Sequence, residues 1–381
     1  MRFEFLTANH IVFGPGTLKE AGKHAKEWGR KALVVHGSNP SRARHLQAIL
    51  HEAHISTREF SIPGEPTVES VVIGAGLARD WGADMAIGIG GGSVIDAAKA
   101  IAGLMRNEDP VEDYLEVVGK GLPLELPAAP WIAIPTTAGT GAEVTKNAVL
   151  TVPSRKLKVS LRSPYLLAPL ALIDPELALG TPPAVTASTG MDALCQLIEA
   201  YVCNRANPMT DALCAAGIPL VARALPAAHA DPLSLAPRCD MALGALWSGM
   251  ALANAGLGAV HGFASPLGGL LGAPHGALCG TLLAPVTAAN IAALRARGLD
   301  CSRFDQVARW LSGDASATAD QATEFLSALS RRLGLPGLSA LGLSEALVPE
   351  VCERALQASS MKANPVALGA GELAAILRSA M

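Results

Sequence analysis

Two histidines lie in a long stretch of the sequence that carries no charged side chain. His261 and His275 stand between Asp240 and Arg295, and no Asp, Glu, Lys or Arg occurs between those two charged residues. Together with a carboxylate, two neutral imidazoles make a ligand set that suits a divalent cation and leaves a coordination position for a substrate. A single histidine is more often an ordinary core or surface residue. The pair is therefore a candidate metal site if a carboxylate joins it.

The segment T-G-M-D-A-L-C-Q-L-I-E-A-Y at residues 189–201 offers that carboxylate. Asp192 and Gln196 are four residues apart, so both point to the same side of a helix, and we place Glu199 on a neighbouring face. Asp192 and the two histidines then form a set of one carboxylate and two imidazoles. These three residues are the candidate catalytic and metal-binding centre, and Gln196 is a further candidate ligand.

A glycine-rich turn, G-I-G-G-G-S-V-I-D-A-A-K-A at residues 88–100, follows an apolar run and opens a helical pattern. Glycines let the backbone approach a phosphate, and the free N–H groups at a helix start favour an anion. We expect Ser93 to cap this helix. The turn does not match G-x-G-x-x-G in the usual way, and no G-K-[ST] follows. By itself it is also compatible with a plain tight turn.

A second segment, I-P-T-T-A-G-T-G-A-E-V-T at residues 134–145, also leaves an apolar run. It offers hydroxyl groups at Thr136, Thr137 and Thr140 beside two glycines. Alone it is equally compatible with an ordinary Ser/Thr-rich loop. Two such loops at the ends of neighbouring strands indicate a nucleotide-binding cleft.

The secondary-structure pattern of the elements that must position these residues changes along the chain. Strands are predicted at 32–36, 85–90, 131–135 and 170–174, and a helix with a Thr cap at its start is predicted over 67–81. Alternating strands and helices predict a parallel sheet covered on both faces. The first apolar runs, F-E-F-L and I-V-F-G, predict an edge hairpin. Helical periods dominate after P-P-A-V-T, so we expect an α/β domain over residues 1–180 and an all-helical domain over 181–381.

Composition narrows the function classes. The net charge is −3 over 381 residues, which gives no electrostatic case for nucleic acid. The seven cysteines are odd in number and form no C-x-x-C pair, so we expect neither a disulfide framework nor a zinc knuckle. With no secretory signal visible, a reducing cytoplasm is the expected location. The uncharged region is long enough for a membrane span, but asparagine, prolines and histidines interrupt it, so buried helices of a soluble protein are expected.

Several motifs occur in order along nearly the whole chain: G-G-G-S-V-I-D-A-A-K-A, I-P-T-T-A-G-T-G-A-E-V-T, G-M-D-A-L, G-A-V-H-G-F-A-S-P-L-G, A-P-H-G and M-K-A-N-P. Together they resemble the iron-containing, or group III, alcohol dehydrogenase family. The resemblance implies an α/β dinucleotide-binding domain followed by an all-helical domain, the fold shared with dehydroquinate synthases. It also implies a homodimer or larger homo-oligomer.

The resemblance assigns roles to single residues. It implies that the pyrophosphate of a dinucleotide lies on Gly90, Gly91, Gly92 and Ser93. Further cofactor contacts are implied for Asp96, Thr136, Thr137, Thr140 and Lys158. Metal coordination is implied for Asp192, His261 and His275.

Two departures from that family's pattern concern the metal. Its usual fourth ligand, a histidine four residues after the aspartate, is Gln196 here, and a further histidine four residues after the position of His261 is Ser265 here. A glutamine carbonyl is a weaker and harder ligand than imidazole, so iron affinity is expected to fall. Zinc, held by one Asp and two His as in related glycerol dehydrogenases, becomes a candidate beside iron. A site with little or no metal dependence, as in maleylacetate reductases, is the alternative.

A third departure concerns the cofactor. Members of that family that prefer NAD often have an acid just after the second predicted strand, where it bonds the adenosine ribose. Here the segment reads V-V-H-G-S-N-P-S-R-A-R. Gly37 and Ser38 leave room, and Arg42 and Arg44 supply positive charge for a 2′-phosphate. NAD and NADP are therefore both candidates, while His36 either stacks on adenine or ends the strand.

The resulting hypothesis is an NAD(P)-dependent oxidoreductase that interconverts an alcohol and an aldehyde or ketone by hydride transfer, assisted by a divalent metal. A lyase of the dehydroquinate synthase type needs a cluster of extra basic residues that is not seen here. A nucleotide-binding protein with decayed catalysis is the alternative from another class. The substrate itself is not revealed, beyond a small-molecule alcohol or aldehyde.

Overall fold

The computed structural model describes residues 2–155 and 157–381, and it divides into two compact units. One unit, here called the α/β unit, comprises Leu6–Thr137 and Gly141–Leu179. The other, here called the helical unit, comprises the first residues up to Phe5, the tripeptide Ala138–Thr140, and Gly180–Met381.

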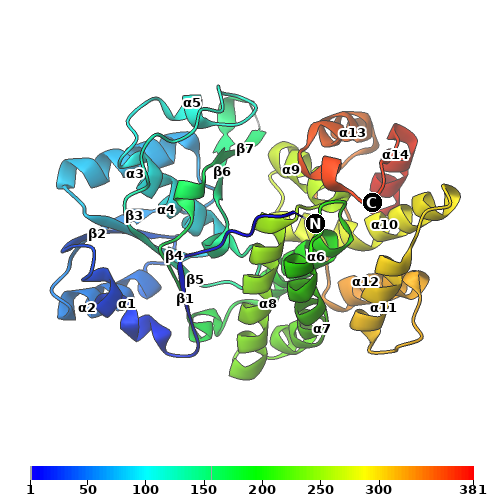
Figure 1. The fold of residues 1–381 in the computed structure, drawn as a ribbon, viewed down its shortest axis with the longest axis horizontal. Helices are drawn as coiled ribbons and strands as arrows, with labels where there is room; N and C mark the ends of the chain where they lie inside the picture. The colour runs from blue at the N-terminus through cyan, green and yellow to red at the C-terminus, as the bar shows by residue number, and fades with distance from the viewer. Residues whose placement is uncertain (1, 156) are drawn as a thin grey trace. The chain divides into compact units, whose positions relative to one another are not determined.

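A six-stranded sheet forms the centre of the α/β unit, and all its described pairings are parallel. Its order is β1-β8-β5-β4-β2-β3. The strands are β1 (His10–Phe13), β2 (Lys31–His36), β3 (Ser56–Ser61), β4 (Met85–Gly90), β5 (Trp131–Pro135) and β8 (Leu170–Ile173). All four strands predicted from the sequence are confirmed. Because parallel strands point the same way, the ends of β2, β4 and β5 meet at one edge of the sheet (Figure 1).

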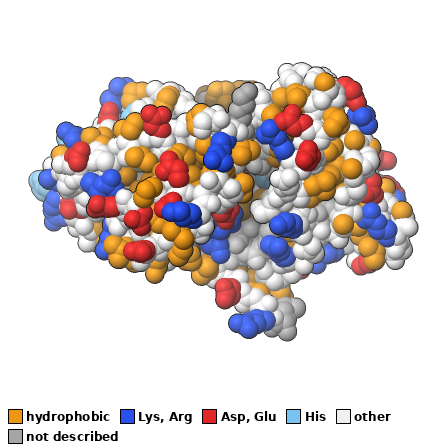
Figure 2. Space-filling view, turned by 90° about the horizontal axis from the view of Figure 1, so that it is seen from above, with side chains coloured by type: hydrophobic (Ala, Val, Ile, Leu, Met, Phe, Trp, Pro, Cys, Tyr) orange, Lys and Arg blue, Asp and Glu red, His pale blue; other side chains and the backbone are white. Residues whose placement is uncertain are grey.

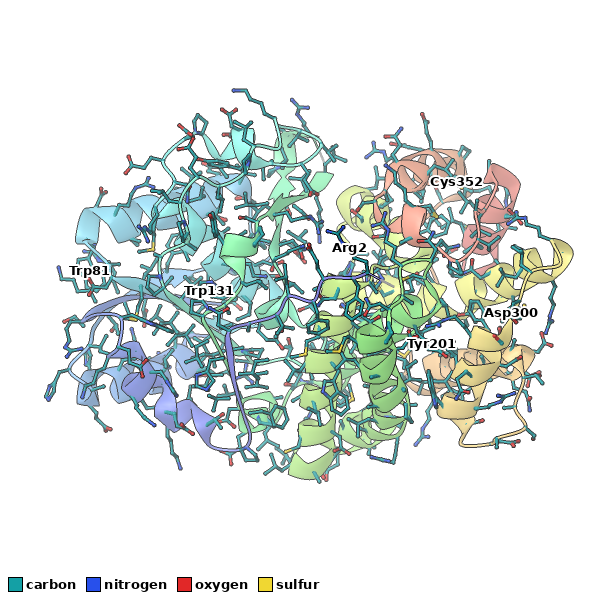
Figure 3. All side chains as sticks on the ribbon, viewed as in Figure 1. Arg2, Trp81, Trp131, Tyr201, Asp300 and Cys352 are labelled. Atoms are coloured by element: carbon teal, nitrogen blue, oxygen red, sulfur yellow. The ribbon has the colours of Figure 1, made fainter. Side chains whose placement is uncertain are left out.

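Helices cover both faces of this sheet, as predicted. The covering helices are α1 (Ala21–Ala25), α2 (Ser41–Glu52), α3 (Val68–Trp81) and α4 (Gly92–Leu104). Along β2 the side chains alternate: Leu33 and Val35 join the core formed with α3 and α4, whereas Val34 joins the core formed with α1 and α2. Strands buried on both faces have continuous apolar sequences, which is why β2, β4 and β5 were recognisable. Trp131 is fully buried in β5 (Figure 3).

Thr67 caps α3 as predicted, since its hydroxyl accepts a hydrogen bond from the Ser70 backbone N–H at 3.0 Å. The edge hairpin predicted for the first apolar runs is wrong. β1 pairs in parallel with β8, in the register His10↔Leu170, and no strand forms among the described residues that precede His10. The segment up to Phe5 belongs instead to the helical unit, so it does not supply an antiparallel partner for β1.

Two features of the α/β unit were not predicted. The edge strand β3, S-T-R-E-F-S, is mostly exposed and polar, so its sequence lacks the apolar run of a central strand. An antiparallel pair, β6 (Asn147–Val152) and β7 (Leu157–Arg162), forms a second sheet, and β6 packs on α4. Short segments complete the unit: η1 (Thr17–Glu20), α5 (Val111–Tyr114), η2 (Ala142–Val144), η3 (Pro153–Arg155), η4 (Pro164–Leu166) and η5 (Pro175–Ala178).

Residues after Gly180 form only helices and turns in the described chain, which confirms the predicted all-helical part. The long helices are α6 (Pro183–Val202), α7 (Pro208–Ala230), α8 (Leu235–Asn254), α9 (Ala259–Leu271) and α10 (His275–Ala296). The remaining ones are α11 (Ser302–Ser312), α12 (Ala319–Arg332), η6 (Glu345–Leu347), α13 (Val348–Gln357), η7 (Ser360–Ala363) and α14 (Ala370–Ser379). The long helices and most of the shorter ones share one apolar core.

Small residues let these helices pack closely. A Cβ at Gly190 of α6 would lie 2.3 Å from a methyl carbon of Leu225 on α7, and one at Gly244 of α8 would lie 2.3 Å from a methyl carbon of Val221. At the rim, the Tyr201 ring stands at the end of α6 (Figure 3), and the Arg303 guanidinium of α11 lies 3.8 Å from its centre. The Ala- and Gly-rich composition is thus explained by helix packing.

Two helices, α7 and α10, are long and apolar enough by composition to cross a membrane. The most apolar window of α10 has a mean hydropathy of 1.7, and 72% of it is buried inside the protein; for α7 the buried share is 44%. Packing against neighbouring helices therefore accounts for most of the apolar surface of α10. Figure 2 shows Lys, Arg, Asp and Glu side chains intermixed on the visible face, with no large patch of one sign.

Candidate active site

Four side chains from three helices meet inside the helical unit. Asp192 comes from α6, His261 from α9, and His275 and Cys279 from α10, and one potential ligand atom of each lies within 4.8 Å of those of the others. Asp192 Oδ1 is 3.2 Å from His261 Nε2 and 3.6 Å from His275 Nε2. The structure therefore brings together the carboxylate and both imidazoles that the sequence singled out.

Local sequence explains how His261 reaches this cluster. α9 begins directly after Gly258, where a Cβ would lie 2.8 Å from oxygens of both Asn364 and Glu199. Only glycine permits this close approach. The Ala259 N–H then donates to Asn364 Oδ1 at 3.0 Å, so the helix start is held by side chains from elsewhere in the unit. His261 consequently lies in the first turn of α9.

Glu199 orients the His261 ring from the side opposite Asp192. Its Oε2 lies 2.6 Å from His261 Nδ1, and its Oε1 accepts a hydrogen bond from the Val260 N–H at 2.7 Å. A carboxylate on Nδ1 keeps the proton there and leaves the lone pair of Nε2 directed at the cluster. The prediction that Glu199 lies on a neighbouring face is wrong. It follows Asp192 by seven residues, about two helical turns, and both carboxylates therefore contact the same imidazole.

Burial and charge oppose each other in this cluster. Burial alone would raise the pKa of Asp192, but His275 and His261 hold that pKa below its ordinary value. Burial would lower the pKa of His261, but Cys279, Asp192 and Glu199 outweigh burial and the pKa lies well above its ordinary value. Burial raises the pKa of the Cys279 thiol. The arrangement thus favours additional positive charge among the side chains, as a proton or as a cation.

The donor atoms fit a divalent transition metal. They comprise one carboxylate oxygen, two imidazole nitrogens and one sulfur, and Asp192 and His261 are almost fully buried, with 2% and 7% of their side chains exposed. Such a mixed O, N and S set suits zinc or iron and differs from the all-oxygen sets of magnesium and calcium. The side chain of His275 is 33% exposed, so it is the least buried of the three predicted ligands.

The two positions that depart from the family pattern, Gln196 and Ser265, lie on the helices that carry Asp192 and His261. Gln196, on α6, is buried, and its Oε1 accepts a hydrogen bond from Ser248 Oγ at 2.8 Å. Ser265 is half-buried in α9, one turn after His261. The Gln196 carbonyl thus has a protein donor independent of any metal.

The glycine turn of the α/β unit has the geometry of an anion site. Gly90 ends β4, Gly91 is the N-cap of α4, and Gly92 and Ser93 form its first turn. A Cβ at Gly90 would lie 2.6 Å from the Val94 side chain, so the close approach of β4 and α4 requires a glycine at this position. The predicted Ser93 cap is wrong: Gly91 occupies the cap position, and it has no side chain that could bond a backbone N–H. The N–H groups of Gly92 and Ser93 are therefore not capped by the N-cap side chain and can donate to a phosphate.

Other predicted cofactor residues gather at the same edge of the sheet. Gly37 and Ser38 follow β2, and Thr136 and Thr137 stand at the end of β5. The Thr136 N–H donates to Gly90 O at 2.9 Å, which fixes this loop beside the glycine turn. The carboxyl edge of a parallel sheet is where α/β proteins bind ligands. Thr140, in contrast, belongs to the tripeptide that joins the helical unit.

Two further predicted cofactor residues have protein partners. Asp96 Oδ2 accepts a hydrogen bond from the Val149 N–H of β6 at 3.0 Å, and its Oδ1 lies 3.6 Å from Lys99 Nζ. Lys158, on β7, pairs with Glu65 at 3.2 Å. In this structure both side chains therefore make contacts within the α/β unit.

A buried lysine fastens α4 to the neighbouring loop and hairpin. Lys99 Nζ donates to Ala142 O at 2.8 Å, to Thr145 Oγ1 at 2.9 Å and to Asn147 O at 2.8 Å, and the side chain is fully buried. These bonds hold the segment after β5 in place beside the glycine turn. Burial raises the pKa of the nearby Glu143 carboxyl to about 7.

The sequence analysis did not identify Cys279 or the contact of Glu199 with His261, although both residues lie at helical spacing from predicted ligands. Cys279 follows His275 by four residues and Glu199 follows Asp192 by seven, so each shares a helix face with a predicted ligand. The missing information was which face of each helix points inward.

Known proteins and family profiles match nearly the whole length of the chain. The profile of the family described as iron-containing alcohol dehydrogenase matches residues 8–175, and the profile described as Fe-containing alcohol dehydrogenase family, C-terminal, matches residues 186–381. Alcohol dehydrogenase 4 of Schizosaccharomyces pombe is 36% identical, over 99% of this chain and 89% of its own. 1,3-Propanediol dehydrogenase of Klebsiella pneumoniae is 34% identical, over 99% of this chain and 98% of its own.

Solved structures agree with these matches. The crystal structure of a 1,3-propanediol oxidoreductase superposes with a TM-score of 0.93 at 33% identity and covers 100% of both chains. An alcohol dehydrogenase from Oenococcus oeni superposes with a TM-score of 0.92 at 30% identity, again over 100% of both chains. With both profiles and these relatives spanning nearly its whole length, this chain belongs to the iron-containing alcohol dehydrogenase family of oxidoreductases.

Proposed function

We propose that this protein is an NAD(P)-dependent dehydrogenase that interconverts a small alcohol and the matching aldehyde or ketone with the help of one divalent metal ion. The observation that carries the proposal is the meeting of Asp192, His261 and His275 from three helices, with ligand atoms within 4.8 Å of one another. The names of relatives support the substrate class, because they include a 1,3-propanediol, a long-chain-alcohol and an NAD-dependent methanol dehydrogenase.

Asp192, His261 and His275 would hold the metal, which supplies Lewis-acid polarisation of an oxygen when it is bound. Asp192 contributes the compensating negative charge. Glu199 keeps the proton on Nδ1 of His261, so that Nε2 presents its lone pair to the cluster. Asp192 and His261 are buried, and the stretch between Asp240 and Arg295 that carries both histidines has no charged side chain; low polarity strengthens electrostatic interactions.

The glycine turn would hold the cofactor. The uncapped N-terminal turn of α4 and the close strand–helix packing at Gly90 suit the pyrophosphate. When bound, the nicotinamide cofactor would accept a hydride from the alcohol carbon in the oxidative direction, and the hydroxyl proton would leave to solvent. Aldehyde reduction reverses both transfers. Arg42 and Arg44 follow the β2 loop and provide positive charge for a 2′-phosphate, so the proposal includes NADP as well as NAD.

The test measures the absorbance of reduced nicotinamide while primary alcohols or aldehydes are added with NAD(H) or NADP(H). Elemental analysis of the same preparation counts the bound metal. His261→Ala and His275→Ala should lose both metal and turnover. An exposed histidine away from the cluster, replaced in His45→Ala, serves as the matched control and should change neither.

Each outcome discriminates between hypotheses. Full activity after chelation and verified metal removal would refute the metal role and favour a reductase of the maleylacetate type. Nucleotide binding without turnover on any alcohol or aldehyde would favour a nucleotide-binding protein with decayed catalysis. We further propose a cytoplasmic homo-oligomer with no nucleic-acid or membrane partner; sedimentation of the purified protein tests the oligomeric state.

A further inference from the structure

The cluster contains a sulfur atom that the family pattern does not require. Cys279 Sγ lies 3.7 Å from His261 Nε2 and 3.6 Å from His275 Nε2. The residue is fully buried on α10, one turn after His275, and it is free of any disulfide. Its side chain therefore shares the inward face of α10 with a proposed ligand.

We propose that Cys279, as a thiolate, is the fourth protein ligand of the metal, in place of the imidazole that is absent at position 196. The inference rests on the proposed metal-dependent function and adds to it the identity of the fourth donor. On coordination the Sγ–H proton passes to solvent and a metal–sulfur bond forms, so no oxidant or reductant is needed.

Four donor–donor distances in the cluster are close to those of a tetrahedral site. Bond lengths of about 2.3 Å to sulfur and about 2.0–2.1 Å to nitrogen or oxygen, at tetrahedral angles, place sulfur and nitrogen about 3.6 Å apart and oxygen and nitrogen about 3.3 Å apart. The sulfur–nitrogen distances here are 3.6 and 3.7 Å, and the oxygen–nitrogen distances are 3.2 and 3.6 Å. One ion at the centre can thus reach all four atoms with little side-chain movement.

Gln196 is a weaker candidate for the same position. Its Oε1 already accepts the hydroxyl of Ser248, which also lies close to Gly139 O and Ala245 O. An amide oxygen is neutral and hard, whereas a thiolate is anionic and soft. A cation placed among Asp192 and two imidazoles gains more from the thiolate.

The fourth ligand changes what the site selects. With Asp192 and Cys279 both anionic, a dication is fully neutralised by its protein ligands, whereas an Asp and three His would leave one positive charge. Thiolate and imidazole together favour zinc. We therefore expect the protein to retain zinc over iron when both are supplied under anaerobic conditions.

The experiment compares wild type with Cys279→Ala, and uses Cys301→Ser, a partly exposed cysteine at the start of α11, as the matched control. Each protein is stripped of metal, reloaded with Zn²⁺ alone or Co²⁺ alone, and titrated against a chelator. X-ray absorption reports the ligand atoms around zinc, and the near-ultraviolet spectrum reports thiolate-to-cobalt charge transfer. Circular dichroism and thermal melting confirm that the variants are folded.

Wild type and Cys301→Ser should show one sulfur at about 2.3 Å from zinc and the cobalt charge-transfer band. Cys279→Ala should lose both signals and bind zinc at least about 100-fold more weakly, because loss of a direct ligand should exceed the 10–100-fold effect of an outer-shell partner. The double variant Gln196→His/Cys279→Ala restores an imidazole, and should recover affinity without recovering the sulfur signal.

The failures are distinguishable. Tight zinc binding by wild type with only nitrogen and oxygen neighbours would overturn the role of Cys279 and leave the metal-dependent function intact. Absence of any zinc or cobalt binding by folded wild type would overturn both. If Cys279→Ala does not fold, the wild-type X-ray absorption spectrum alone decides, because the sulfur neighbour is either present or absent.

Discussion

Glu199 offers the sharpest test of how the site is held. In Glu199→Gln the side chain keeps its size but only one terminal atom still accepts hydrogen bonds. The carboxylate now accepts from the Val260 N–H at 2.7 Å and contacts His261 Nδ1 at 2.6 Å, so while His261 keeps its proton on Nδ1 the amide leaves one of these buried donors facing its own NH₂ group. An unpaired buried donor costs about 1–3 kcal/mol. We expect the metal-free variant to lose that much unfolding free energy.

The same change should weaken metal binding. Without the carboxylate, the His261 ring is less firmly held with Nε2 toward the cluster, and loss of such an outer-shell partner typically costs about 10–100-fold in affinity. Urea unfolding of the metal-free protein measures the first effect and chelator competition measures the second. Glu353→Gln, an exposed position on α13, is the control. Unchanged stability together with unchanged metal affinity would refute the role assigned to Glu199.

Further predictions concern the α/β unit. Gly88→Ala should destabilise the protein by about 1–3 kcal/mol, because its Cβ would lie 2.6 Å from that of Ala98. Gly91→Ala should instead weaken nucleotide binding, which fluorescence titration measures, and should change the melting temperature little. The pKa of Glu143 is raised from 4.5 to about 7, so the free energy of unfolding should fall by about 3 kcal/mol as the pH rises from about 4.5 to 7. Glu143→Gln should flatten that part of the curve of unfolding free energy against pH. An unchanged slope in this variant would contradict the role of Glu143. Arg42→Ala should weaken NADP binding and spare NAD, and an equal loss for both would exclude a phosphate contact.

The fold was predictable wherever burial imposes a simple pattern. Central parallel strands must be apolar on both faces, so β2, β4, β5 and β8 are recognisable as short apolar runs. The edge strand β3 meets water on much of its surface, and its polar sequence resembles that of a loop. The prediction of an edge hairpin failed because the pairing of β1 with β8 joins residues about 160 positions apart, and no local pattern encodes that choice.

The sequence indicated which residues belong to the site better than it indicated which way their neighbours' side chains point. Asp192, His261 and His275 were identified because two imidazoles in an uncharged stretch need an explanation. Which side of α10 points inward depends on tertiary packing, so Cys279 was not recognised as their neighbour. The cofactor contact of Asp96 stays a prediction; the structure adds that its carboxylate accepts a hydrogen bond from the Val149 N–H, a contact that the motif did not indicate.

The division of the chain into units bears on how the protein can be dissected and how it is made. The chain passes from one unit to the other after Phe5, Thr137, Thr140 and Leu179. A fragment starting at residue 181 would therefore lack the tripeptide whose Gly139 carbonyl oxygen lies 3.3 Å from Ser248 Oγ. During synthesis the segment up to Phe5 leaves the ribosome before the helical unit to which it belongs. Its docking must wait until helices of that unit have emerged, and contacts between residues so distant in sequence are slow to form.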